Sequence, residues 1–100
     1  MNESMMDRVP PHNHEAEQSV IGAIFLEPQA LITASEILLP TDFYRTAHQK
    51  IFQTMLTLSD QGKAIDVITV TEELSAKKEL EDVGGLSYLS ELANAVPTAA

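Results

Sequence analysis

The chain has 100 residues, a length that supports one domain with a single hydrophobic core. It contains no cysteine, which excludes disulfide bonds, cysteine-ligated zinc and thiol catalysis. Its 15 acidic residues outnumber 6 basic ones, the net charge is −9, and the largest basic cluster is Lys77-Lys78. Because nucleic-acid binding depends on Lys and Arg that neutralise phosphates, we expect these residues to bind no nucleic acid directly.

Residues 1–12 predict a flexible N-terminal arm that ends at Pro10-Pro11, since proline cannot enter a helix interior. This arm has no positively charged segment followed by an apolar run, so no signal peptide is evident. No apolar stretch in the chain approaches the roughly 18 residues that span a membrane. The lack of cysteine is compatible with a cytosolic origin.

The first helix is predicted over residues 13–27, with Asn13 as the N-cap and Pro28 just beyond the end. From Val20 to Leu26 nearly every position is apolar, which predicts a helix at the centre of the core. A second helix is predicted over residues 28–38, with Pro28 in its first position. Its expected inward side chains are Leu31, Ala34 and Leu38, with Ile32 beside them.

Residues 46–59 form the clearest amphipathic pattern and predict a third helix. Gly62, just beyond the pattern, supplies a residue suited to the left-handed conformation that often ends a helix. The expected inward side chains are Ala47, Ile51, Met55 and Leu58, with Phe52 and Leu56 widening the face.

Residues 65–71 are ambiguous, because six of the seven are β-branched and favour a strand. No second convincing strand exists to pair with it, and Thr69 with Glu72 forms the Thr-x-x-Glu capping pattern. We therefore expect a fourth helix over residues 70–78.

A connector with a turn at Gly84-Gly85 follows, for which Leu80 and Val83 are the expected anchors. A fifth helix is predicted over residues 86–95, before Pro97. Its expected inward side chains are Leu86, Leu89, Leu92 or Ala93, and Val96. The sequence thus predicts an all-α fold, a compact bundle of five to six short helices over residues 13–97. Residues 98–100 read as the start of a further helix or linker.

The candidate chemical residues each have a simpler structural interpretation. His12 and His14 could ligate a metal ion, but no third ligand is in view. His48 lies on the amphipathic helix, where catalysis would need a partner carboxylate, and a structural or surface role competes with it. Gly84-Gly85 lacks the spacing and lysine of a phosphate loop. We predict no catalytic, cofactor or metal-binding residue.

Tyr88 is a different kind of candidate. It lies near the edge of the expected buried face of the fifth helix, where an aromatic side chain either anchors a protein partner or packs into the core. Both interpretations stay open on the residues alone. Either way, the chain reads as a non-catalytic helical interaction domain.

Several blocks in order resemble the N-terminal domain of bacterial replicative DNA helicases of the DnaB family, in its Firmicute type. The resemblance runs from about Arg8 to the end of the chain. Its blocks are Arg8-Val9-Pro10-Pro11, Glu15 to Gly22, Phe43-Tyr44-Arg45 with His48-Gln49-x-Ile51-Phe52, Ile65 to Val70, Gly84-Gly85-x-x-Tyr88-Leu89, and Asn94 to Thr98.

The resemblance implies a collar domain that self-associates as dimer pairs on a hexameric ring and recruits the helicase-binding C-terminal domain of a DnaG-type primase. A helicase loader acts on the same ring, within the cytoplasmic replisome. The resemblance places ATP, Mg²⁺ and the DNA-unwinding motor in a separate C-terminal RecA-like domain, so this chain is expected to be no enzyme itself. Tyr88 falls on a helix that the family offers to primase, which makes it the expected primase-binding residue.

Three other functions compete with this expectation. The chain could be a stand-alone helical adaptor, or a helicase paralogue that regulates the ring without a motor. It could also be a small metal-dependent enzyme that uses His48 and nearby carboxylates. Reading the gene beyond Ala100 for a motor domain distinguishes a helicase from a paralogue without a motor. Metal analysis of the purified protein tests whether the chain is a metal-dependent enzyme.

Overall fold

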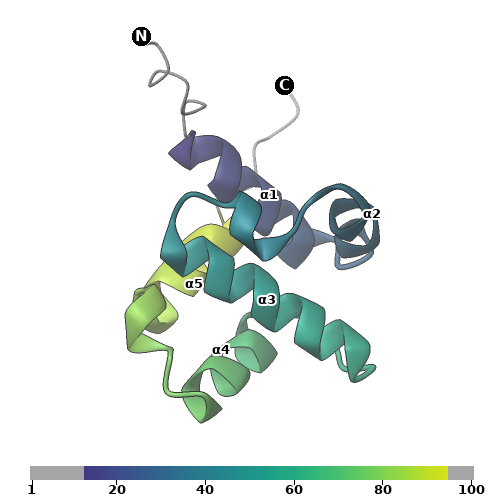
Figure 1. Ribbon diagram of the computed structural model, residues 1–100. Coiled ribbons are helices and arrows are strands. Elements are labelled where there is room, and N and C mark those ends of the chain that lie inside the picture. The colour runs from purple at the N-terminus through teal and green to yellow at the C-terminus, as the bar shows by residue number, and fades with distance from the viewer. Residues whose placement is uncertain (1–12, 95–100) are drawn as a thin grey trace, which may run out of the picture.

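The computed structural model describes residues 13–94, and these form a bundle of helices with no strand among them (Figure 1). The α-helices are α1 (His14–Leu26), α2 (Ala30–Ile37), α3 (Thr46–Asp60), α4 (Val67–Ala76) and α5 (Gly85–Asn94). Two short 3-10 helices join them, η2 (Pro40–Asp42) before α3 and η3 (Glu81–Val83) before α5. The prediction of an all-α bundle is confirmed.

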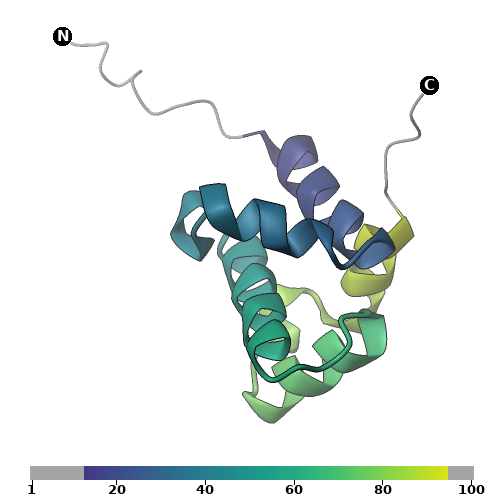
Figure 2. The same ribbon diagram turned by 90° about the vertical axis from the view of Figure 1, so that its right-hand side faces the viewer.

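The helices pack around α3. One side of α3 contacts α1 and α2 and another contacts α4, while α5 closes the bundle by packing on α1 and α4. Figure 2 shows α1 and α2 together at one end of the molecule and α4 at the other. The core is mainly aliphatic, and its buried apolar residues are Ile21, Ile24, Leu31, Phe43, Ile51, Phe52, Met55, Leu58, Ile65, Val70, Leu74, Val83, Leu89 and Leu92. None of the described helices is long and apolar enough to cross a membrane.

The start of α1 and the end of α3 follow the sequence prediction. The Asn13 side chain accepts a hydrogen bond of 2.9 Å from the backbone N–H of Ala16, as an N-cap should. Gly62 has a φ of +70°, and the next N–H, of Lys63, bonds back to the Leu58 carbonyl over 2.9 Å.

Helix α2 begins at Ala30, two residues later than predicted. The N–H groups of Ala30 and Leu31 bond to the carbonyls three residues earlier, of Glu27 and Pro28, so Pro28 lies in a tight turn before the helix. Leu31 is buried as expected, but Ile32 is 62% exposed. Successive helix positions are about 100° apart, so Ile32 turns away once Leu31 faces the core.

Two other predicted inward residues are exposed, Leu26 at 68% and Leu86 at 53%. Each lies in a terminal turn, which its neighbours cover from fewer directions than a mid-helix position. Helix α1 therefore has one buried face, with Ile21 and Ile24, rather than burial on all sides. Val96 and the predicted last residue of the fifth helix lie outside the described residues.

The prediction of a helix rather than a strand within residues 65–71 is confirmed, but α4 starts at Val67, not at the predicted residue 70, and ends at Ala76, not at residue 78. The cap is Asp66, whose carboxylate accepts from the Thr69 N–H over 2.8 Å, while the Thr69 hydroxyl accepts from the Asp66 N–H over 2.9 Å. The predicted pairing of Thr69 with Glu72 is therefore wrong. Thr69 has an acidic residue three positions away on each side, and the pattern did not show which one caps.

Candidate functional site

Four polar side chains from three helices meet inside the bundle. They are Glu17 and Gln18 of α1, His48 of α3 and Tyr88 of α5. The Nδ1 atom of His48 lies 2.7 Å from a Glu17 oxygen, and its Nε2 atom lies 2.7 Å from the Tyr88 hydroxyl. The Gln18 amide nitrogen lies 3.1 Å from the same hydroxyl. We call these four residues the polar network.

The bonds of the polar network have a defined direction. A carboxylate can only accept a hydrogen bond, so the Nδ1 atom of neutral His48 must carry the proton and donate the hydrogen bond to Glu17. The Nε2 atom of His48 is then an acceptor and takes the Tyr88 O–H. The Tyr88 oxygen in turn accepts from the Gln18 amide. Because every member is paired, a fully buried histidine is tolerated here.

Glu17 also holds the connection between η2 and α3. Its carboxylate accepts from the backbone N–H of Tyr44 over 2.6 Å and from that of Arg45 over 3.4 Å. Burial would raise the pKa of Glu17, but the hydrogen bonds from His48, Tyr44 and Arg45 outweigh it and lower the pKa below the ordinary value of 4.5. Glu17 is therefore held as a carboxylate.

Three rings of the site lie side by side, two of them nearly parallel and the third tilted. The Tyr88 and His48 rings are nearly parallel, 13° apart in plane, with centroids 5.9 Å apart. The His14 ring lies 5.5 Å from that of His48. Burial lowers the pKa of His48 below the ordinary 6.5, against the raising effect of the Glu17 hydrogen bond and charge. The neutral imidazole that the bond directions require is thus also the favoured form.

Gly84 allows Tyr88 to approach its own turn closely. Its φ is +109°, and a Cβ atom built there would lie 2.8 Å from the Tyr88 Cβ. Gly62 also has a positive φ, +70°, but a Cβ there would meet nothing within 4 Å. A side chain at Gly62 would therefore cause backbone strain alone, whereas one at Gly84 would cause the same strain and a steric clash as well.

Gly84→Ala is expected to destabilise the domain by about 2–3 kcal/mol, and Gly62→Ala by only about 1 kcal/mol, because only the first adds a clash to the left-handed strain. Urea denaturation of the two variants measures the difference. Equal losses would show that Tyr88 gives way to the added methyl group without cost.

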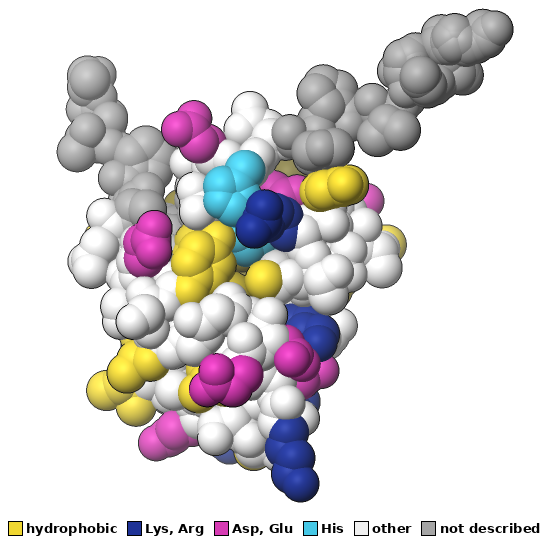
Figure 3. All heavy atoms as spheres, turned by 90° about the vertical axis from the view of Figure 1, so that its left-hand side faces the viewer, with side chains coloured by type: hydrophobic (Ala, Val, Ile, Leu, Met, Phe, Trp, Pro, Cys, Tyr) yellow, Lys and Arg dark blue, Asp and Glu magenta, His cyan; other side chains and the backbone are white. Residues whose placement is uncertain are grey.

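Tyr88 lies in the wall of an open groove of about 480 Å³. Arg45 and Ala47 line it from the start of α3, and Gly84, Ser87 and Glu91 line it from η3 and α5, together with Glu81, Asp82 and Val83. We call it the Tyr88 groove. Figure 3 shows a face where a histidine and a basic side chain adjoin hydrophobic surface, with acidic side chains around them. The groove thus joins one aromatic ring, one arginine and several carboxylates.

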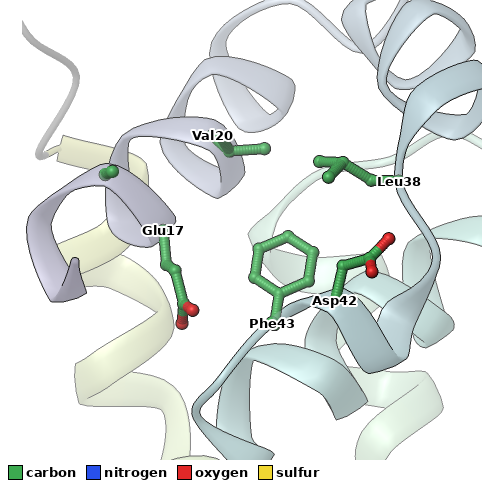
Figure 4. A pocket seen from close by; sticks show the side chains of 6 residues that line it. Glu17, Val20, Leu38, Asp42 and Phe43 are labelled. Atoms are coloured by element: carbon green, nitrogen blue, oxygen red, sulfur yellow. The ribbon is translucent and has the colours of Figure 1, made fainter. Parts of the chain in front are cut away.

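A second, smaller pocket of about 130 Å³ lies on the other side of Glu17. Figure 4 shows Val20 of α1 and Leu38 and Phe43 of the α2–α3 connection around it, with the Glu17 and Asp42 carboxylates at its rim. Its apolar lining contains no nucleophile. Asp42 already accepts a hydrogen bond from the backbone N–H of Leu39 over 2.7 Å.

The order carboxylate, histidine, hydroxyl in the polar network is also that of a catalytic relay. A relay needs a nucleophile that substrate can reach. Here the hydroxyl of Tyr88 is turned towards His48 and Gln18, and His48 is 0% exposed. The structural interpretation of His48 therefore holds. Among residues 13–94, no three potential ligands are grouped to hold a metal ion.

Sequence reasoning found His48 and Tyr88 separately but missed Glu17 and Gln18. The missed signal is that Glu17 precedes Ile21 and Ile24 by four and seven positions, on the face that those residues bury. A glutamate in line with core residues needs a buried partner. The partners come from the blocks around Tyr44 and Tyr88, so three of the blocks behind the resemblance converge on one site.

Two curated relatives match this chain over its whole length. A replicative DNA helicase DnaB from Geobacillus stearothermophilus is 61% identical over 100 residues, and a replicative DNA helicase DnaC from Bacillus subtilis is 58% identical over 100 residues. The chain spans 22% of the length of each of these Firmicute proteins, and both matches cover all of it.

A solved structure gives the same result for the fold. The crystal structure of the N-terminal domain of DnaB helicase from Mycobacterium tuberculosis matches with a TM-score of 0.85 at 42% identity, over 90% of this chain and 65% of that one. The family model for the DnaB-like helicase N-terminal domain matches residues 9–100. By sequence and by fold, the chain belongs to the family of DnaB-like helicase N-terminal domains.

Proposed function

We propose that this domain is the collar of a hexameric replicative helicase and that it recruits primase through the Tyr88 groove. In this proposal the domain self-associates in dimer pairs on the ring, where a helicase loader also acts. ATP, Mg²⁺ and DNA unwinding belong to a motor domain, and the assembly works at the cytoplasmic replisome. The family membership and the relatives' names as replicative DNA helicases support this.

The observation that carries the docking role is the groove around Tyr88. The Tyr88 ring is half-buried and rigid, because its hydroxyl is bonded to His48 and Gln18. A rigid aromatic side chain in a concave surface is the usual form of a binding hot spot. The carboxylates of Glu81 and Glu91 in the groove favour a partner segment with basic residues, while Asp82 is already paired with Lys50 at 3.0 Å.

Tyr88→Ala, introduced into a helicase that carries this domain, is expected to weaken binding of the primase C-terminal domain by about tenfold or more, as truncation of a hot spot does. Calorimetric titration measures the affinity. The matched control is Ile68→Ala on α4, which removes a side chain that is 68% exposed and does not line the groove. Equal affinities of wild type and Tyr88→Ala would exclude the groove as the docking site.

A further inference from the structure

Glu17 bonds directly to one residue that lines the Tyr88 groove, Arg45, and through His48 it reaches a second one, Tyr88. Neither Glu17 nor His48 lines the groove itself. We propose that Glu17 is the positioning residue of this groove: through His48 it orients the Tyr88 ring, and through the backbone it places Arg45. A partner in the groove then contacts the aromatic ring of Tyr88 and not its hydroxyl. This inference rests on the proposed docking function.

The first step is the route from Glu17 to Tyr88. The carboxylate fixes the Nδ1–H form of His48, and only that form leaves Nε2 free to accept the Tyr88 O–H. The bond holds the two rings 5.9 Å apart and nearly parallel. The Tyr88 hydroxyl already makes two hydrogen bonds within the domain, since it donates to His48 and accepts from Gln18. What remains for a partner in the groove is the aromatic ring.

The second step is the route from Glu17 to Arg45. Arg45 is the residue before α3 and has no side-chain cap, so its backbone position depends on other contacts. The Glu17 carboxylate supplies them by accepting from the N–H groups of Tyr44 and Arg45. One side chain of α1 therefore sets both the aromatic ring on α5 and the cation at the start of α3.

The third step is that glutamine cannot replace Glu17 in this place, although it has almost the same size. Three donors face the carboxylate: His48 Nδ1–H and the N–H groups of Tyr44 and Arg45. A glutamine amide has one oxygen, and its NH₂ group would have to face one of those donors. His48 relieves the conflict by moving its proton to Nε2. The Nε2–H then donates to the Tyr88 oxygen instead of accepting from it, so the Tyr88 O–H loses its acceptor and the ring is held less firmly.

The experiment combines two readouts, one on the 100-residue chain and one on a helicase that carries this domain. Nitrogen-15 NMR of the isolated 100-residue chain measures the His48 tautomer, and titration with the primase C-terminal domain measures affinity. Glu17→Gln is expected to shift the His48 proton from Nδ1 to Nε2 and to weaken binding at least about fivefold, as the loss of an oriented hot spot does. Glu72→Gln, an exposed position on α4, is the matched control and should change neither.

Tyr88→Phe is the second variant, and it keeps the proposal testable if Glu17→Gln does not fold. It retains the ring but removes the hydroxyl through which His48 and Glu17 orient it, so its affinity should fall about as much as in Glu17→Gln and less than in Tyr88→Ala, which loses the ring itself. A loss in Tyr88→Phe as large as in Tyr88→Ala would show that a partner reads the hydroxyl and would overturn this inference. Unchanged affinity in Glu17→Gln, with Tyr88→Ala still defective, would overturn it while the docking function stands. Unchanged affinity in Tyr88→Ala would overturn both.

Discussion

Ile24→Asp is expected to unfold the domain completely. Ile24 is 1% exposed and packs from the buried face of α1 into the core. The substitution removes about 2–3 kcal/mol of apolar burial and places a carboxylate where no partner is available, which costs several kcal/mol more. A domain of this length has only about 5–15 kcal/mol of stability in total. Circular dichroism at 25 °C should show the loss of most helical signal.

The control for this expectation is the same exchange on the surface. Ile32→Asp on α2 replaces a side chain that is 62% exposed, so it should keep the helical signal and change stability by less than about 1 kcal/mol. A folded Ile24→Asp variant would mean that α1 can shift to expose position 24. An unfolded Ile32→Asp variant would mean that Ile32 is covered in solution, for example by a second copy of the chain.

The periodicity of apolar residues predicted the helices well where local signals agree. Helix α3 has an apolar face at regular spacing and a glycine with positive φ at its end, and α1 has an asparagine cap and a proline stop. Local signals failed where they competed. At α4, propensity favoured a strand and two acidic residues competed to pair with Thr69, so the type of element was predicted and its start was not.

The polar network was beyond prediction from spacing, because its bonds join residues 31, 40 and 70 positions apart. Such pairs form only when α1, α3 and α5 pack together. The sequence of one helix does not show which other helices it will pack against. The burial of His48 could be anticipated from its place three and four positions before Ile51 and Phe52, because residues at these spacings share one face of a helix. Its partners could not, since the chain has 15 acidic residues and chance pairings are many.

His48→Ala is expected to cost about 2–4 kcal/mol at pH 7, because it opens a cavity beside Phe43 and removes the acceptor of the buried Tyr88 hydroxyl. Urea denaturation measures this loss. The matched control is His14→Ala, an exposed histidine at the start of α1, which should cost less than about 1 kcal/mol. Equal losses in the two variants would mean that the polar network adds nothing to the stability of the fold.

The same variant should also change how stability depends on pH. The pKa of His48 is lowered in the folded state, so below the ordinary value of 6.5 the unfolded chain binds a proton that the folded chain does not. Stability therefore falls as the pH drops from 6.5 towards the folded-state pKa. The pKa of Glu17 is also lowered, so its contribution is complete above 4.5 and is lost only as the pH falls below that value.

Between pH 6.5 and 4.5 the wild-type domain should thus lose the stability linked to His48, and His48→Ala should lose none of that part. Urea midpoints measured across this range give the two slopes. His14→Ala should keep most of the slope due to His48, because burial is the largest cause of the lowered His48 pKa and the charge of His14 is a smaller one. If His48→Ala falls as steeply as wild type, His48 takes up its proton equally in both states. A flat wild-type curve would mean that Glu17 holds a protonated His48 inside the bundle, which would reverse the direction of the Tyr88 hydrogen bond.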